Sequence, residues 1–217
     1  MKFIVFILTV LLSLRAWADY TLAVFGDSLS AGYHLNAEDS FYAQLERALQ
    51  NKGYKVSVLN ISKSGEVTAG GVRRTPTVLN KKPDGVILEL GINDAFRKIP
   101  VSSIQKNLQH MIDLFQQNKI AVLLVGMKAP LYLQADYQQA FEKMYSDLAS
   151  QNGILLYPFF MDGIFDEVHI LNARHQNEYL LLNDFHPNAR GINVMVQGIL
   201  PTVEQFLNKQ GVFVNGY

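Results

Sequence analysis

Residues suited to acyl transfer recur along the sequence, each next to the end of an apolar run or the start of a helical pattern. Ser28 lies in "GDSLSAGY" after the run 22–25, Asn93 lies in "GIND" after the run 85–90, and His186 precedes the last helical pattern. Acyl transfer to water by a serine needs a base for the nucleophile, a group that orients the base, and hydrogen-bond donors for the oxyanion. The sequence contains candidates for each of these parts.

Each candidate also has a purely structural explanation. A serine after a strand is a favoured helix N-cap, and this applies to Ser28 and to Ser30. Asn93 and Gly65, in "SKSGEV", are common turn residues, although a side-chain amide and a bare backbone N–H can both bind an oxyanion. His186 by itself could be a surface or capping residue. The spacing in "GDS" also differs from the G-x-S-x-G elbow of the α/β-hydrolases.

Composition excludes several other kinds of chemistry. The 217-residue chain has no cysteine, so it has neither disulfides nor thiolate metal sites. No grouping of His, Asp and Glu has the spacing of metal ligands. The 19 basic and 19 acidic residues give a formal charge of zero, whereas nucleic-acid binding normally requires a basic face. We therefore expect no metal, no other cofactor and no nucleic-acid partner.

The elements that must position the candidate residues alternate between apolar runs and longer patterns with helical spacing. The runs predict strands at 20–25, 55–60, 85–90, 120–127 and 154–160. The helical patterns predict helices at 40–53, 70–82 (irregular around Pro76), 102–119, 135–153 and 189–210 (bent near Gly198 and Pro201). Apolar strands that alternate with helices indicate a parallel sheet covered on both faces. The sequence thus predicts an α/β fold, a three-layer, doubly wound, flavodoxin-like domain with five parallel strands, whose ligands bind at the carboxyl ends of the strands.

The first eighteen residues are typical of a secretory signal peptide. Lys2 is followed by "FIVFILTVLLSL", which is too short to span a bilayer comfortably, and then by "AWA", which ends at Ala18. A membrane anchor and a buried first strand are the alternatives. We expect cleavage after Ala18, a single domain over 19–217, a periplasmic or secreted monomer, and no stable membrane anchor.

Taken together, the motifs resemble those of the GDSL, or SGNH, hydrolase family. The four marker residues of the family fall on Ser28, Gly65, Asn93 and His186, in the family's order. The segments "NISKSGEVTAGGVRRTP" and "YQQAFEKMYSDLA" are closer to the bacterial periplasmic branch of thioesterases, lysophospholipases and arylesterases. The resemblance implies that Ser28 is the nucleophile and His186 its base. The implied oxyanion donors are the backbone N–H groups of Ser28 and Gly65 and the side chain of Asn93.

One position departs from the family pattern, which places an aspartate three residues before the histidine. Asn183 occupies that position, and Asp184 follows it. We expect Asp184 to orient His186; a neutral Asn183 in that role and a Ser–His dyad are the alternatives. The preceding stretch, 166–183, is also longer than in the family, and the sequence does not reveal how it shapes the loop.

The resemblance implies a serine esterase that hydrolyses small-molecule acyl esters or thioesters through an acyl-enzyme. The loops after the third and fourth strands supply five candidate pocket residues, for which ordinary packing is the alternative: Phe96, Ile99, Pro130, Leu131 and Tyr132. Two other functions remain open. A carbohydrate O-acetylesterase would need an open, polar cleft, and a non-catalytic binding module with a decayed triad is suggested by Asn183.

Overall fold

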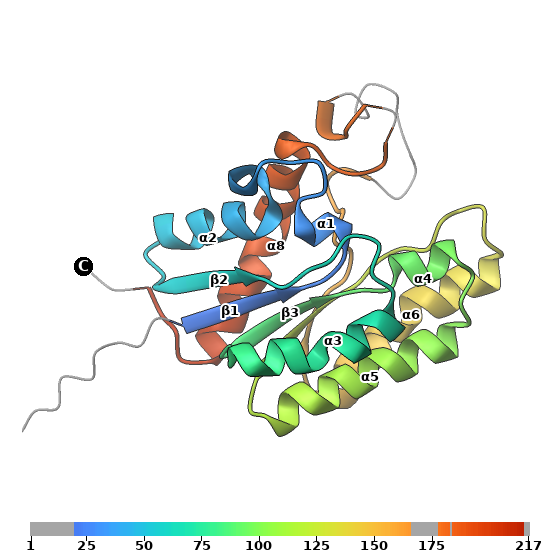
Figure 1. The fold of residues 1–217 in the computed structure, drawn as a ribbon, viewed down its shortest axis with the longest axis horizontal. Helices are drawn as coiled ribbons and strands as arrows, with labels where there is room; N and C mark the ends of the chain where they lie inside the picture. Colours follow the sequence, from blue (N-terminus) through green and yellow to red (C-terminus); the bar gives the residue numbers. More distant parts are fainter. Residues whose placement is uncertain (1–19, 166–177, 183, 215–217) are drawn as a thin grey trace, which may run out of the picture.

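Five parallel strands form one sheet at the centre of the molecule (Figure 1). The computed structural model describes residues 20–165, 178–182 and 184–214, so the expected signal peptide and Asn183 lie outside the described residues. The strands are β1 (Tyr20–Phe25), β2 (Val56–Asn60), β3 (Gly85–Glu89), β4 (Ala121–Val125) and β5 (Leu155–Tyr157). Their order is β2-β1-β3-β4-β5, and every neighbouring pair is parallel. The predicted doubly wound α/β fold is confirmed.

Helices cover both faces of the sheet, as expected for strands that are apolar on both sides. On one face α2 (Phe41–Asn51) packs against α8 (Ala189–Lys209). The other face carries α3 (Thr68–Lys81), α5 (Val101–Gln117) and α6 (Ala135–Asn152). Among the residues that the structure describes, no helix is both long and apolar enough to cross a membrane.

Two helices continue through a proline at which the sequence suggests an irregularity. Pro76 lies within α3 and Pro201 within α8, and each helix is unbroken along its length. A proline removes one backbone hydrogen bond from a helix. In α8 the buried apolar side chains on both sides of Pro201, among them Ile199 and Val203, hold the helix against the rest of the core. Tertiary packing thus maintains the helix despite the missing bond.

The strand order reverses between β1 and β3. The chain leaves β1 toward β2 on one side, and it leaves β3 toward β4 on the other. A short helix follows each of these strands: α1 (Ser28–Ala31) after β1 and α4 (Ile92–Phe96) after β3. Because the two connections diverge, doubly wound sheets have a crevice at this point, and ligands bind there.

Candidate active site

A chain of hydrogen bonds joins Ser28, His186 and Asp184. His186 Nε2 lies 2.8 Å from Ser28 Oγ, and His186 Nδ1 lies 2.7 Å from Asp184 Oδ1. Burial by itself would raise the pKa of Asp184, but the hydrogen bonds and charge of His186 outweigh this effect and hold that pKa below its ordinary value. Asp184 is therefore a carboxylate at neutral pH. A negative charge at this place can orient the imidazole and stabilise its protonated form.

The turn after β1 leaves the Ser28 hydroxyl available to His186. Asp27 is the N-cap of α1, because its carboxylate accepts the backbone N–H of Leu29 at 3.0 Å. Ser28 is therefore not the capping residue. The helix ends after one turn at Gly32, whose φ of 80° is left-handed. Ser30, the other candidate serine, is fully buried and donates its hydroxyl to Glu89 at 2.7 Å.

A buried carboxyl group lies directly beneath this turn. Glu89, at the end of β3, is fully buried, and its Oε2 accepts the Ser30 hydroxyl and, at 3.3 Å, the backbone N–H of Asp27. A Cβ at Gly26 would come within 2.4 Å of the same oxygen, so this close approach requires glycine. Burial, reinforced by the charge of Asp27, raises the pKa of Glu89 well above its ordinary value. The buried site therefore favours the protonated form of Glu89.

Asn93 is fixed by the same turn. Its Nδ2 donates to Asp27 Oδ2 at 2.9 Å, which links α4 to the cap of α1. An amide nitrogen carries two hydrogens, so the second N–H of Asn93 is available for a substrate oxygen. Burial raises the pKa of Asp27, and the charge of Asp94 adds to this, while hydrogen bonds from Leu29 and Asn93 oppose it. The hydrogen bond from Asn93 thus favours the ionised form of Asp27, and the same bond holds the Asn93 amide in place.

Gly65 lies in the turn after β2 with a φ of 74°, and no atom lies within 4 Å of the place where its Cβ would stand. Two contacts tie this turn to the other loops of the crevice. Arg97 Nη2, just after α4, donates to the Gly65 carbonyl at 3.3 Å, and the Lys63 N–H donates to the Gly26 carbonyl at 3.0 Å. The open space around Gly65 lets a substrate approach its backbone.

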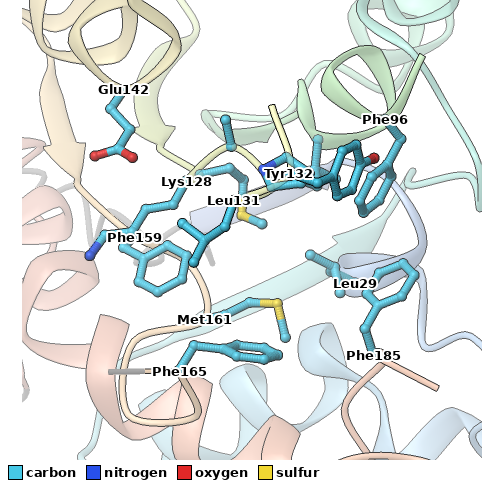
Figure 2. Close-up of a pocket in the computed structure, with 14 residues that line it drawn as sticks. Leu29, Phe96, Lys128, Leu131, Tyr132, Glu142, Phe159, Met161, Phe165 and Phe185 are labelled. Carbon is cyan, nitrogen blue, oxygen red and sulfur yellow. The ribbon is translucent and has the colours of Figure 1, made fainter. Parts of the chain in front are cut away.

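Figure 2 shows an apolar pocket of about 440 Å³. Its wall includes Leu29 and Phe185, the chain neighbours of Ser28 and His186. Four of the five residues expected in an acyl pocket also line it: Phe96, Pro130, Leu131 and Tyr132. The pocket therefore lies next to the chain segments that carry Ser28 and His186.

Ile99, the fifth residue expected there, is not in the lining. The chain reverses after α4 through Lys98, whose φ of 55° is left-handed. Ile99 then packs against the core, and its carbonyl accepts the Tyr137 hydroxyl at 2.7 Å. The backbone path of this loop keeps Ile99 out of the pocket lining, and the types of the residues alone do not reveal that path.

Sequence reasoning missed one wall of the pocket. Further lining residues come from the ends of β4 and β5 and from the loop before His186: Met127, Lys128, Phe159, Met161, Phe165 and Phe185. Lys128 Nζ lies 4.9 Å from the centroid of the Phe159 ring, and in Figure 2 this pair lies away from Leu29 and Phe185. The apolar segment "YPFFMDGIF" after the fifth strand is the signal that points to this wall.

Comparisons with known proteins identify the family of the chain. A family model described as GDSL-like lipase/acylhydrolase matches residues 24–193. Esterase TesA of Pseudomonas aeruginosa is 33% identical over 199 residues, which cover 91% of this chain and 94% of that protein. Thioesterase 1/protease 1/lysophospholipase L1 of Escherichia coli is 34% identical over 161 residues, 74% of this chain and 76% of that protein. The crystal structure of the psychrotrophic esterase EstA from Pseudoalteromonas sp., inhibited by monoethylphosphonate, has a TM-score of 0.78 at 25% identity and covers 88% of this chain and 100% of that one. The chain belongs to the GDSL-like lipase/acylhydrolase family.

Proposed function

We propose that this protein is a serine hydrolase that cleaves acyl esters and thioesters through an acyl-enzyme on Ser28. The observation that carries the proposal is the hydrogen-bonded series Ser28–His186–Asp184, whose chain neighbours Leu29 and Phe185 line an apolar pocket. The names of the relatives, esterase and thioesterase 1/lysophospholipase L1, support the same class of reaction.

The geometry supports the following sequence of steps. Ser28 Oγ attacks the acyl carbonyl carbon while its proton passes to His186 Nε2, 2.8 Å away. The carbon–oxygen or carbon–sulfur bond then breaks, and the leaving group takes the proton from His186. A water molecule attacks the acyl-enzyme with His186 again as base, which releases the carboxylic acid and restores Ser28.

The oxyanion of each tetrahedral intermediate needs donors that are already in place. The Asn93 amide, fixed by Asp27, and the backbone N–H groups of Ser28 and Gly65 take this role in the proposal. Donors held before the reaction need no reorganisation when charge develops on the oxygen. The Asp27–Asn93 bond therefore contributes to catalysis through the position of the amide.

The lining of the pocket favours an apolar acyl chain over an acetylated sugar. The pocket wall consists mainly of Leu, Ile, Met and aromatic side chains, with Lys128 and Glu142 as its charged members. Transfer of methylene groups from water into such a wall is favourable, by about 0.8 kcal/mol for each CH₂ that is buried. A carbohydrate O-acetylesterase would gain nothing from this space. The intact hydrogen-bonded series likewise disfavours a decayed, non-catalytic module.

Export belongs to the same proposal. The features of residues 1–18 support a cleaved signal peptide, so the substrate is an ester or thioester outside the cytoplasm. The mature chain from 19 to 217 acts as a single domain and a monomer.

Covalent labelling tests the proposal directly. A fluorophosphonate probe should label the purified protein, and Ser28→Ala should abolish both the label and the hydrolysis of p-nitrophenyl esters. Ser30→Ala is the matched control, and it should keep the label. Loss of the label in Ser30→Ala with retention in Ser28→Ala would overturn the assignment of the nucleophile. A panel of p-nitrophenyl esters from acetate to octanoate should give rising kcat/KM with chain length.

A further inference from the structure

Two aromatic rings pack against the imidazole of His186. The centroid of the Tyr33 ring lies 4.4 Å from that of His186, with an angle of 36° between the planes. The Phe185 ring lies 4.3 Å away and is nearly parallel, at 28°. The two rings come from different segments: Tyr33 lies in the turn after α1, and Phe185 precedes His186 in the chain.

The hydrogen bonds of His186 do not hold its ring plane by themselves. Both bonds, to Ser28 and to Asp184, act at ring nitrogens and lie close to the plane of the ring. The two bonds fix the positions of the ring nitrogens between Ser28 Oγ and Asp184 Oδ1. They only weakly resist rotation of the imidazole ring about the axis that joins these two oxygen atoms. Packing against the faces of the ring supplies the missing restraint.

The backbone of His186 lies outside the helices and strands. Its carbonyl accepts the Leu181 N–H at 2.8 Å, and its N–H donates to Asp184 Oδ1 at 3.2 Å. Tyr33, in contrast, is part of the turn that carries the nucleophile, and its N–H bonds to the Ser28 carbonyl at 3.3 Å. Tyr33 therefore places one face of the base relative to the nucleophile itself.

The second ring contact of Phe185 is with a pocket residue, whereas that of Tyr33 is with His34, at 4.0 Å between centroids. The Phe185 ring meets Phe96 edge to face, with centroids 5.3 Å apart, and both rings line the apolar pocket. Phe185 is 40% exposed in the empty pocket. An acyl chain in the pocket would cover this exposed surface and restrict the ring against His186.

We propose that Tyr33 and Phe185 are positioning residues that hold the imidazole plane of His186, and that Phe185 couples the filling of the acyl pocket to this alignment. The proposal rests on the proposed function, because it assigns His186 as the base. Both rings also favour the imidazolium that forms when His186 takes the Ser28 proton, since aromatic faces attract cations. This stabilisation arises during the reaction, so it raises kcat more than it lowers KM.

Kinetics of three variants on p-nitrophenyl acetate and octanoate test the proposal. Tyr33→Leu should lower kcat by roughly 3- to 10-fold on both esters with little change in KM, the size expected for one aromatic contact. Tyr33→Phe keeps the ring and should restore kcat to within about twofold, a rescue that does not depend on the hydroxyl. Phe185→Leu should lower kcat more on octanoate than on acetate, which reduces the ratio of the two kcat values.

Phe96→Leu is the matched comparison, because Phe96 lines the pocket but does not touch His186. It should raise KM for octanoate and keep the wild-type ratio of kcat values. An unchanged kcat in Tyr33→Leu, or an equal effect of Phe185→Leu on both esters, would overturn the proposal. If Tyr33→Leu does not fold, the kcat ratio of Phe185→Leu alone tests the proposal. Phe185 is partly exposed, so its substitution is expected to leave the fold intact. Failure of a fluorophosphonate to label wild-type Ser28 would instead reject the proposed function.

Discussion

Asp184→Asn removes the negative charge beside His186 and keeps nearly the same shape. Asp184 Oδ1 lies 2.7 Å from the ring nitrogen, so the charge acts on the imidazolium at short range. Two unit charges about 4 Å apart attract by about 4 kcal/mol at an effective dielectric constant near 20. Each 1.4 kcal/mol corresponds to about tenfold in rate. We therefore expect Asp184→Asn to lower kcat by about 10³-fold.

This loss is smaller than the roughly 10⁴-fold effect of the same substitution in serine proteases, where the aspartate is buried. The Asp184 side chain is 30% exposed, and water screens part of its charge. Steady-state hydrolysis of p-nitrophenyl butyrate measures kcat, and thermal unfolding checks that the variant is folded. Asn183→Ala is the matched control, one position earlier, and should change kcat by less than about threefold.

The reasoning would be refuted by the opposite pair of results. If Asn183→Asp raises kcat while Asp184→Asn leaves it unchanged, the orienting group belongs at position 183. If neither substitution matters, the enzyme works as a Ser28–His186 dyad.

Three further predictions follow from the surroundings of the site. Asn93→Ala should lower kcat by about 10²–10³-fold and also lower the Tm, because the buried carboxylate of Asp27 loses a partner; a change in KM alone would make Asn93 a simple binding group. In the folded protein, burial favours the protonated form of Glu89, whereas in the unfolded chain its carboxyl group ionises above its ordinary pKa of 4.5. As the pH rises above 4.5, Glu89 therefore lowers the free energy of unfolding. Glu89→Gln should therefore reduce the fall in Tm between pH 5 and pH 8, and an equal fall in both proteins would contradict this. Protein recovered from the periplasm of a Gram-negative host should begin at Asp19 by mass spectrometry, whereas membrane-bound material with Met1 intact would argue for an anchor.

Local patterns in the sequence predict most of the fold. An apolar run such as 85–90 indicates a strand covered on both faces, and β3 is buried at all five positions. The short helices α1 and α4 could not be predicted in this way, because four or five residues are too few to establish a period. Local turn geometry starts them instead: Asp27 caps α1, and α4 begins after Gly91, whose φ is 135°.

The sequence also supplies the candidate catalytic residues, because their types and their places beside strands or helical patterns are local properties. Ser28, Asn93 and His186 are candidates on these grounds, and only the order of all the motifs, which resembles that of the GDSL family, favours a catalytic role over a cap or turn role. Glu89 is visible as an acid within an apolar run, but its position beneath Gly26 depends on the pairing of β1 with β3. Strand pairing joins residues that are far apart in the chain, and no local pattern encodes it.

What the sequence determined by itself is the parallel sheet, the nucleophile turn and the residues that could serve as base and oxyanion donor. The tertiary structure decided which way side chains in the turns point. It brings Asp184 to the ring nitrogen, turns Ile99 away from the pocket and places Tyr33 beside the ring of His186. The physical reason is distance along the chain: Ser28 and His186 are 158 positions apart, and the side-chain directions there depend on packing between segments rather than on local periodicity.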